Sequence, residues 1–206
     1  MVLPLHIFEE RYRHLVRDLL DAPEPRRFGV IAIREGRETG ADGVTALYGI
    51  GCVAELREAD EQLDGRFEII TVGTGRFRLG PLDHSRPYLQ AEVEHITDVE
   101  GDRAGEEALA VRAAQVAFRE YLDALVKHGG ATVRIEELPD EPVLLSYVIA
   151  AAMIIDLPER QGLLAEPDAL SRLTAERALL AREAAMLRAT TTRPAPDLRN
   201  THYNPN

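Results

Sequence analysis

The fold is decided by Leu47-Tyr-Gly-Ile-Gly-Cys-Val-Ala-Glu-Leu-Arg-Glu58, which is followed by Asp64-Gly65 and then by Arg66-Phe-Glu-Ile-Ile-Thr-Val72. Both runs are rich in β-branched and aromatic residues, which favour extended strands. Asp-Gly between two such runs is typical of a tight type I′ turn, because both residues tolerate positive φ. The segment therefore predicts an antiparallel β-hairpin.

Shorter runs of the same composition flank this hairpin, at Phe28–Arg34, Arg76–Leu79 and Tyr88–Thr97. Short strands separated by Gly, Asp and Pro are typical of antiparallel β-structure. No long helix alternates with them, which disfavours a doubly wound parallel sheet. Three glycines in Glu35–Gly43 predict an exposed hairpin loop there.

Helical periodicity is found on both sides of the strands. Apolar residues from Phe8 to Leu19 recur at helical spacing, which predicts a helix that ends near Asp21. After the acidic linker Asp98–Gly105, we expect helices over the following segments: about Glu106–Lys127, one capped by Asp140 and running to Ile155, and two more that begin at Pro158 and Asp168. The tail from Thr190 contains three prolines and no apolar periodicity, and we expect it to be disordered.

These elements indicate the α+β class, with a compact antiparallel β-domain followed by a C-terminal helical bundle. The expected division is 1–97 for the β-domain with its N-terminal helix, 98–189 for the helical bundle, and 190–206 for the tail.

Composition narrows the classes of function. The 206 residues include 24 basic and 35 acidic side chains, a net charge of -11 at pH 7, which disfavours nucleic acid as a partner. The longest apolar stretch, Pro142–Ile155, is too short for a bilayer span, so we expect no membrane association. Cys52 is the single cysteine, which excludes an internal disulfide and agrees with a cytoplasmic protein.

No catalytic, metal or cofactor site is indicated. Lys127 is the only lysine and lies outside any P-loop motif, which excludes a Walker ATPase. No two histidines have zinc-protease spacing, and none of the three serines lies in G-x-S-x-G. Gly73-Thr74-Gly75 is not followed by the third glycine and helix of a dinucleotide site. A hydrolase with an unrecognised carboxylate or histidine site stays open as an alternative.

Several separated motifs together resemble the Lon protease N-terminal, substrate-binding domain. They are Leu3-Pro-Leu-His-Ile-Phe-Glu-Glu-Arg-Tyr-Arg13, Phe28-Gly-Val30, Ile50-Gly-Cys-Val-Ala-Glu-Leu56, Asp64-Gly-Arg66, Val72-Gly-Thr-Gly-Arg-Phe-Arg-Leu79, Leu138-Pro-Asp-Glu-Pro-Val-Leu-Leu-Ser-Tyr147 and Leu157-Pro-Glu-Arg-Gln-Gly-Leu-Leu164. The resemblance covers roughly residues 1–189, and related domains occur in cereblon-like ubiquitin ligase receptors.

The resemblance implies a PUA-like antiparallel pseudo-barrel beside a helical bundle. It also implies a non-enzymatic module that binds unfolded or exposed polypeptide segments, with polypeptide substrates or a protease ATPase as partners and no cofactor. The PUA-like fold leaves an RNA binder as a further alternative, which the acidic charge opposes. No oligomeric state is predicted from the sequence.

The family pattern begins with a further strand ahead of the region that matches Met1. We therefore expect Met1–Ile7 to run extended along the sheet, with Pro4 at an edge or bulge where its missing N–H is harmless. We also expect a chain extended upstream by about 12 to 15 residues to melt at a higher temperature, since another strand adds ladder hydrogen bonds and buried apolar area.

Two groups of residues are candidates for specific roles. Glu9, Arg11 and Arg76 are expected to form a structural charge network that ties the first helix to the sheet, because charges close to core aromatics need partners. Tyr48, Phe77 and Tyr88 are the candidates for partner binding, since aromatic side chains dominate binding hot spots.

Overall fold

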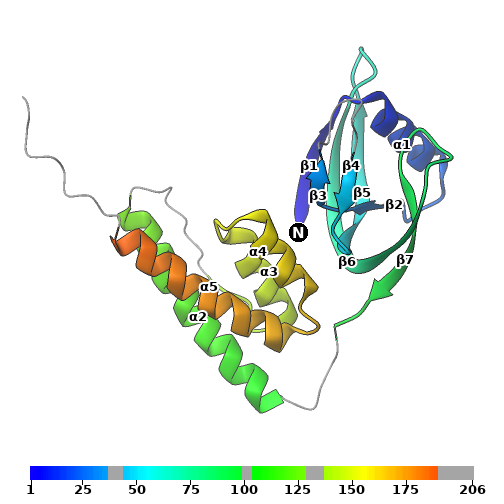
Figure 1. Cartoon of the computed structure of the whole chain (residues 1–206). Helices are drawn as coiled ribbons and strands as arrows, with labels where there is room; N and C mark the ends of the chain where they lie inside the picture. Colours follow the sequence, from blue (N-terminus) through cyan, green and yellow to red (C-terminus); the bar gives the residue numbers. More distant parts are fainter. Residues whose placement is uncertain (37–43, 99–103, 129–136, 190–206) are drawn as a thin grey trace, which may run out of the picture. The chain divides into compact units, whose positions relative to one another are not determined.

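The computed structural model describes residues 1–36, 44–98, 104–128 and 137–189, and the chain divides into two compact units (Figure 1). Met1–Glu100 together with Ile154–Asp168 forms the first, here called the β unit, and Gly101–Met153 with Ala169–Asn206 forms the second, the helical unit. The α+β class predicted from the sequence is confirmed. The expected tail from Thr190 and most of the expected loop Glu35–Gly43 lie outside the described residues.

The β unit consists of strands and two helices. These are β1 (Val2–Ile7), α1 (Glu10–Asp21), β2 (Arg27–Val30), β3 (Ile33–Gly36), β4 (Val44–Leu47), β5 (Ile50–Glu61), β6 (Phe67–Asp83), β7 (Gln90–Ile96) and α4 (Leu157–Ala165). The strands β1, β6, β5 and β2 pair in that order, β7 also pairs with β6, and β3 and β4 form a separate two-stranded sheet. Every pair is antiparallel.

Strand β6 organises the main sheet. It is 17 residues long, and β1 pairs with its first half, β7 with its second half and β5 with its other side. The sequence predicted two strands here, and that prediction is wrong. Gly73 and Gly75 stay within the ladder, where the register with β5 shifts between Val53 and Ala54. A β-bulge of this kind accommodates the extra residue of β6 without ending the strand.

The predicted hairpin between β5 and β6 is confirmed, but the predicted turn type is wrong. Gly65 has φ +76°, whereas Asp64 does not have a positive φ, and a type I′ turn requires positive φ at both central residues. The N–H of Gly65 donates to the carbonyl of Gln62 at 2.8 Å, and the N–H of Gln62 donates to the carbonyl of Arg66 at 2.8 Å. This is a longer hairpin loop closed by glycine in the left-handed region.

Helix α1 covers one face of the main sheet. Val16, Phe67 and Ile69 are buried together at its centre. Apolar residues from both sides pack around them, namely Leu5, Ile7, Leu20, Phe28, Leu56 and Ala59. The predicted helix is confirmed, although it begins at Glu10 and leaves Phe8 55% exposed outside its apolar stripe.

Helix α4 groups with the β unit, whereas the sequence placed it in the helical bundle. Asp156 caps it, since its carboxylate accepts a hydrogen bond from the N–H of Glu159 at 2.9 Å. The carbonyls at its other end are held by Arg76 of β6. Such contacts between distant parts of the chain leave no trace in local periodicity.

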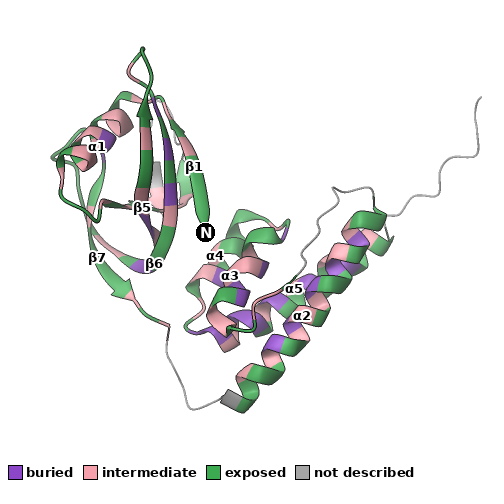
Figure 2. Ribbon diagram, turned by 180° about the vertical axis from the view of Figure 1, so that it is seen from behind, coloured by how far each residue is buried: buried purple, intermediate pink, exposed green. Residues whose placement is uncertain are grey.

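The helical unit consists of α2 (Ala104–Lys127), α3 (Pro142–Ala152) and α5 (Ala169–Ala189). The buried residues of α5 recur at helical spacing, so one side of the helix faces the interior of the bundle (Figure 2). Helix α3 is capped by Glu141 and not, as expected, by Asp140: the Glu141 carboxylate accepts hydrogen bonds from the N–H groups of Val143 and Leu144. Asp140 instead accepts a hydrogen bond from Gln115 at 3.1 Å.

Two charged side chains lie inside this helical core. Arg172 is fully buried, donates to Ser146 Oγ at 2.8 Å and lies over the Tyr147 ring at 4.4 Å. Glu176, also fully buried, has no hydrogen-bond partner for its carboxyl oxygens among the described residues. Burial raises the pKa of Glu176 to about 9, against the opposing effect of the Arg172 charge. The carboxyl is therefore protonated at neutral pH.

Candidate functional site

Two of the three aromatic residues predicted to bind a partner are buried. Phe77 is 3% exposed, and its ring packs against Gly51 so closely that a Cβ there would lie 2.4 Å from it. Tyr88 is 8% exposed. Tyr48 is half-buried, and its N–H donates to the carbonyl of Ala32 at 3.0 Å. The burial of Phe77 and Tyr88 leaves little of either ring exposed for contact with a partner.

Tyr88 fastens the chain after β6 to helix α1. Its hydroxyl donates to Asp18 at 2.7 Å, and Arg86 donates to the same Asp18 oxygen at 2.7 Å. The Tyr88 hydrogen bond, helped by the Arg86 charge, lowers the pKa of Asp18. Burial and the neighbouring Asp18 raise the pKa of Tyr88.

The three residues of the expected charge network fall into two groups. Arg11 bonds Glu9 at 3.0 Å. Arg76 is 4% exposed and bonds instead to Asp98 and to the carbonyls of Leu164, at 2.7 Å, and Glu166, at 2.6 Å. Arg76 therefore joins β6 to α4, a role that its place in the sequence does not reveal.

The side chains that could bind a metal ion and the single cysteine are the remaining candidates for chemistry. No group of three or more His, Cys, Asp and Glu side chains in these ranges is placed to hold a metal ion. Burial raises the pKa of Cys52, which makes its thiol less nucleophilic. None of the helices within the described ranges combines the length and apolar character that a bilayer span requires.

The outer face of the main sheet is the surface best suited to contact another molecule. Val2 of β1 pairs with Val72 of β6, and Pro4 pairs with Ile70. Val2 is 65% and Ile70 37% exposed. A shallow hollow of about 270 Å³ lies next to Pro4 and Ile70. We call the apolar surface of Val2, Pro4, Ile70 and Val72 the outer face.

Carboxylates border the outer face. Glu58 pairs in register with Ile70, and Asp60 with Glu68. Glu68 bonds His6 of β1 at 2.5 Å, and Asp60 accepts a hydrogen bond from Gln62 at 2.9 Å. No partner for the Glu58 carboxylate is found within the described residues. The apolar surface therefore has an acidic border.

Strand β1 leaves one of its two edges unpaired. Among the described residues, its only strand partner is β6. The N–H of Gly73 donates to the carbonyl of Met1 at 3.0 Å. In an antiparallel pair the backbone groups of successive residues point alternately toward the partner strand and away from it, so this bond shows which residues of β1 face β6. The N–H and C=O groups of Val2 and His6 and the C=O of Pro4 consequently point away from β6. The prediction that β1 is an extended edge strand with Pro4 at a harmless position is confirmed.

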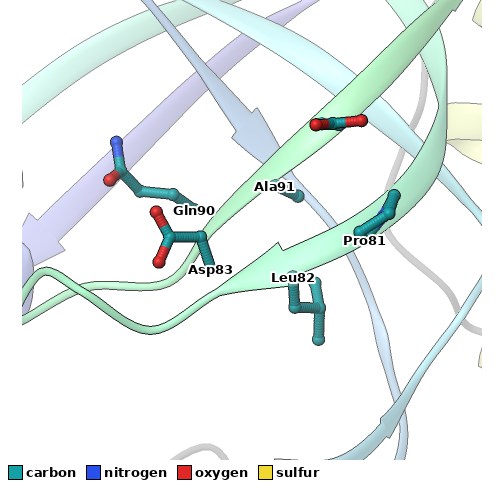
Figure 3. Close-up of a pocket in the computed structure, with 6 residues that line it drawn as sticks. Pro81, Leu82, Asp83, Gln90 and Ala91 are labelled. Atoms are coloured by element: carbon teal, nitrogen blue, oxygen red, sulfur yellow. The ribbon is translucent and has the colours of Figure 1, made fainter.

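A second, larger hollow of about 370 Å³ lies between β6 and β7. Figure 3 shows Asp83 and Gln90 close together at one end of it, with Leu82 directed away from them. The Asp83 carboxylate already accepts hydrogen bonds from the N–H and the hydroxyl of Ser85, at 2.8 and 2.9 Å. These bonds lower the pKa of Asp83. The hollow therefore offers a weaker docking surface than the outer face.

The outer face was not predicted from the sequence, although one signal for it was present. Ile69 and Ile70 are adjacent in a predicted strand, and adjacent strand residues point to opposite sides of a sheet. With Ile69 in the core, Ile70 must face outward. An apolar residue at such a position indicates a surface that contacts something.

Comparisons with known proteins agree with this architecture. The model of the family described as the ATP-dependent protease La (LON) substrate-binding domain matches residues 1–182. Lon protease 2 of Syntrophobacter fumaroxidans is 26% identical over 175 residues, which are 84% of this chain and 21% of that protein. Lon protease 2 of Myxococcus xanthus is 26% identical over 188 residues, 91% of this chain and 22% of that protein. The chain thus spans about a fifth of the length of these relatives.

Solved structures show the same fold. The Lon N-terminal domain protein from Xanthomonas campestris matches with a TM-score of 0.59 and 24% identity, over 88% of this chain and 89% of that one. The N-terminal domain of Mycobacterium avium complex Lon protease matches with a TM-score of 0.57 and 14% identity, over 90% of each chain. With the family match over residues 1–182, the chain belongs to the family of the ATP-dependent protease La (LON) substrate-binding domain.

Proposed function

We propose that this protein is a non-enzymatic recognition module that binds unfolded or exposed polypeptide segments. The observation that carries the proposal is the match of residues 1–182 to a substrate-binding domain family. The exposed apolar outer face supports it, because an exposed apolar surface is suited to contact the apolar side chains of another polypeptide. The single cysteine supports a cytoplasmic location as part of the same proposal.

The test measures binding of the full chain to one model protein in two states. A reduced and alkylated, permanently unfolded protein is labelled with a fluorophore, and its anisotropy is followed as this protein is added. The native form of the same model protein is the control. We expect binding of the unfolded form only. Equal binding of both forms, or of neither, would refute the proposal.

Two other functions are less well supported. A PUA-like fold suggests RNA binding by analogy, but the net charge of -11 and the acidic border of the outer face oppose phosphate binding. RNA binding that weakens steeply with salt would favour that alternative. A hydrolase would require turnover that is abolished by substitution of one histidine or carboxylate.

A protease ATPase is the proposed partner that receives the bound segments. The relatives in which this domain is recognised are Lon proteases, and this chain covers about a fifth of their length. Affinity purification from the native host tests the proposal. Co-purification of an ATP-dependent protease would support delivery, whereas its absence alongside bound unfolded proteins would indicate an independent binder.

A further inference from the structure

We infer that the binding surface extends from the outer face to the loop between β5 and β6, and that it selects polypeptide segments in which a basic residue lies between two apolar residues about four to six positions apart. This inference rests on the proposed function and assigns it a second anchor and a substrate class. It stands on three features of the structure: an exposed leucine in that loop, the hydrogen bonds that hold the loop, and the acidic border between the leucine and the outer face.

Leu63 is the most exposed large apolar side chain within the described residues. Its relative exposure is 112%, compared with 68% for Met1 and 67% for Ile154. Figures 1 and 2 both show the loop between β5 and β6 projecting from one end of the β unit. A single exposed leucine is ordinary on a protein surface, so the case for Leu63 depends on the loop that carries it and on its surroundings.

The loop that carries this leucine is held by hydrogen bonds. The N–H of Gly65 donates to the carbonyl of Gln62, and the N–H of Gln62 donates to the carbonyl of Arg66, both at 2.8 Å. Arg66 also donates to the Asp64 carboxylate, from its N–H at 3.1 Å and from Nε at 2.6 Å. Gly65 lies so close to Arg13 of α1 that a Cβ there would be 2.3 Å from the guanidinium. A partner that binds the leucine therefore does not have to order the loop first.

The acidic border lies between Leu63 and the apolar part of the outer face. Glu68 is two residues before Ile70 on β6, and side chains two apart on a strand share one face of the sheet. Glu58 pairs with Ile70 and Asp60 with Glu68, so the three carboxylates lie on the side of the sheet that Ile70 occupies. This part of β6 lies between β1 and β5, so the surface does not depend on a free sheet edge.

The acidic border is suited to a positive charge. No partner for the Glu58 carboxylate is found within the described residues. Asp60 accepts a hydrogen bond from the neutral amide of Gln62 at 2.9 Å, which does not neutralise its charge. Glu68 bonds His6 at 2.5 Å. An arginine or lysine placed over Glu58 and Asp60 would therefore meet complementary charge.

The separation of the two anchors sets the spacing of the apolar residues. The ladder between β5 and β6 ends at Phe67, three residues before Ile70, which corresponds to about 10 Å of strand. The loop carries Leu63 roughly two residue lengths further, so the anchors lie about 15 to 17 Å apart. An extended segment needs about five residues to span this distance. Apolar residues that are adjacent in the segment reach only one of the two anchors.

A second copy of this chain is the other candidate occupant, and charge disfavours it. Each copy would bring its own acidic border to the contact, in a chain of net charge -11. Like charges that approach one another oppose association. A polypeptide segment that carries a basic residue has no such penalty.

The experiment measures the anisotropy of fluorophore-labelled synthetic peptides. The test peptide has two leucines separated by four residues, with one arginine midway between them, in a background of serine and glycine. One control peptide has the arginine outside the pair of leucines, and a second has the leucines adjacent. We expect about three-fold weaker binding of the first control and about ten-fold weaker binding of the second. Equal affinities of the three peptides would refute the selection.

Variants of Leu63 test the second anchor. Leu63→Ser removes it, and Leu109→Ser is the matched control, because Leu109 is a 63% exposed leucine of the helical unit. We expect Leu63→Ser to bind the test peptide about ten-fold more weakly than the wild type, as the loss of a leucine contact predicts. Leu109→Ser should bind it like the wild type. Equal affinities of Leu63→Ser and the wild type would place the peptide elsewhere.

Substitution of Glu58 tests the charge preference. Glu58→Gln should weaken binding of the test peptide about three-fold, the effect expected for an exposed ion pair. A peptide in which norleucine replaces the arginine should bind both proteins equally. Glu106→Gln, at an exposed glutamate of α2, is the control and should change neither affinity. If both peptides respond alike to Glu58→Gln, the charge assignment is refuted.

The failure of this inference is distinguishable from failure of the proposed function. If an unfolded protein binds the wild type and Leu63→Ser equally well, the second anchor is wrong and the function stands. If the wild type binds neither unfolded protein nor peptide, the proposed function fails too. Sedimentation of the protein alone must show no dimer that Leu63→Ser dissociates, since such a dimer would mean that a second copy occupies the surface.

Discussion

Substitution Glu176→Gln should change the pH dependence of stability in a way that the structure fixes. Glu176 is fully buried without a hydrogen-bond partner for its carboxyl oxygens among the described residues, and its pKa is raised from 4.5 to about 9. Between these two values the folded protein keeps a proton that the unfolded chain releases. The contribution of this group to stability is therefore complete below pH 4.5 and is lost as the pH rises through about 9.

The size of the effect follows from linkage. One proton of difference lowers the free energy of unfolding by about 1.4 kcal/mol for each pH unit. Between about pH 6 and about pH 8, Glu176 should therefore account for a loss of about 2.7 kcal/mol. Glutamine has nearly the same shape and does not ionise, so the Glu176→Gln variant should lack this loss.

Urea denaturation followed by helical circular dichroism, at several pH values in this range, measures the difference. All other ionisable groups are common to both proteins, so their effects cancel when the variants are compared. Glu120→Gln is the matched control, since Glu120 is an exposed glutamate of the same helical unit, and it should keep the wild-type pH dependence. If Glu176→Gln also keeps the wild-type pH dependence, the protonated state assigned to Glu176 is wrong.

Three further substitutions test the structural roles assigned above. Arg76→Met should destabilise the β unit by about 3 to 5 kcal/mol, because it leaves Asp98 and the carbonyls at the end of α4 without their buried partner. Amide hydrogen exchange in α4 should become faster, whereas the control Arg78→Met, at an exposed arginine, should leave it unchanged. Unchanged exchange in α4 of Arg76→Met would contradict the role assigned to Arg76. Gly51→Ala should destabilise by about 1 to 3 kcal/mol in thermal denaturation, because its Cβ would meet the Phe77 ring. Gly49→Ala has open space and should be nearly neutral, and equal effects of the two would argue against the close packing. Tyr88→Phe should raise the pKa of Asp18 toward its ordinary 3.8, measured by NMR titration, because the Tyr88 hydrogen bond is the main cause of the lowered value; an unchanged pKa would mean that Arg86 alone sets it.

Local sequence chemistry predicted several elements of the fold, although it divided β6 into two strands. The hairpin between β5 and β6 follows from two β-rich runs around Asp64-Gly65, and α1 follows from its apolar spacing. The turn type was missed because the glycine alone takes positive φ. The cap of α3 was displaced from Asp140 to its neighbour Glu141, since both residues have a carboxylate within reach of the free N–H groups.

Contacts between residues far apart in the sequence could not be predicted from local sequence patterns. Arg76 binds carbonyls of residues that follow it by 88 and 90 positions, and no pattern around Arg76 identifies them. The burial of Phe77 depends on Gly29 and Gly51 in two other strands, so it becomes visible only when the register is known. The outer face was in principle predictable from the adjacent Ile69 and Ile70, whereas the free edge of β1 required the strand order.

Binding of a reduced and alkylated, permanently unfolded model protein should be visible by NMR at the outer face. Val2, Ile70 and Val72 lie on this face, whereas Ile69 lies in the core. We expect the unfolded protein to shift the amide resonances of Val2, Ile70 and Val72 and to leave that of Ile69 nearly unchanged. Bound protein without shifts at these three residues, or with shifts confined to other strands, would show that the outer face is not the binding surface.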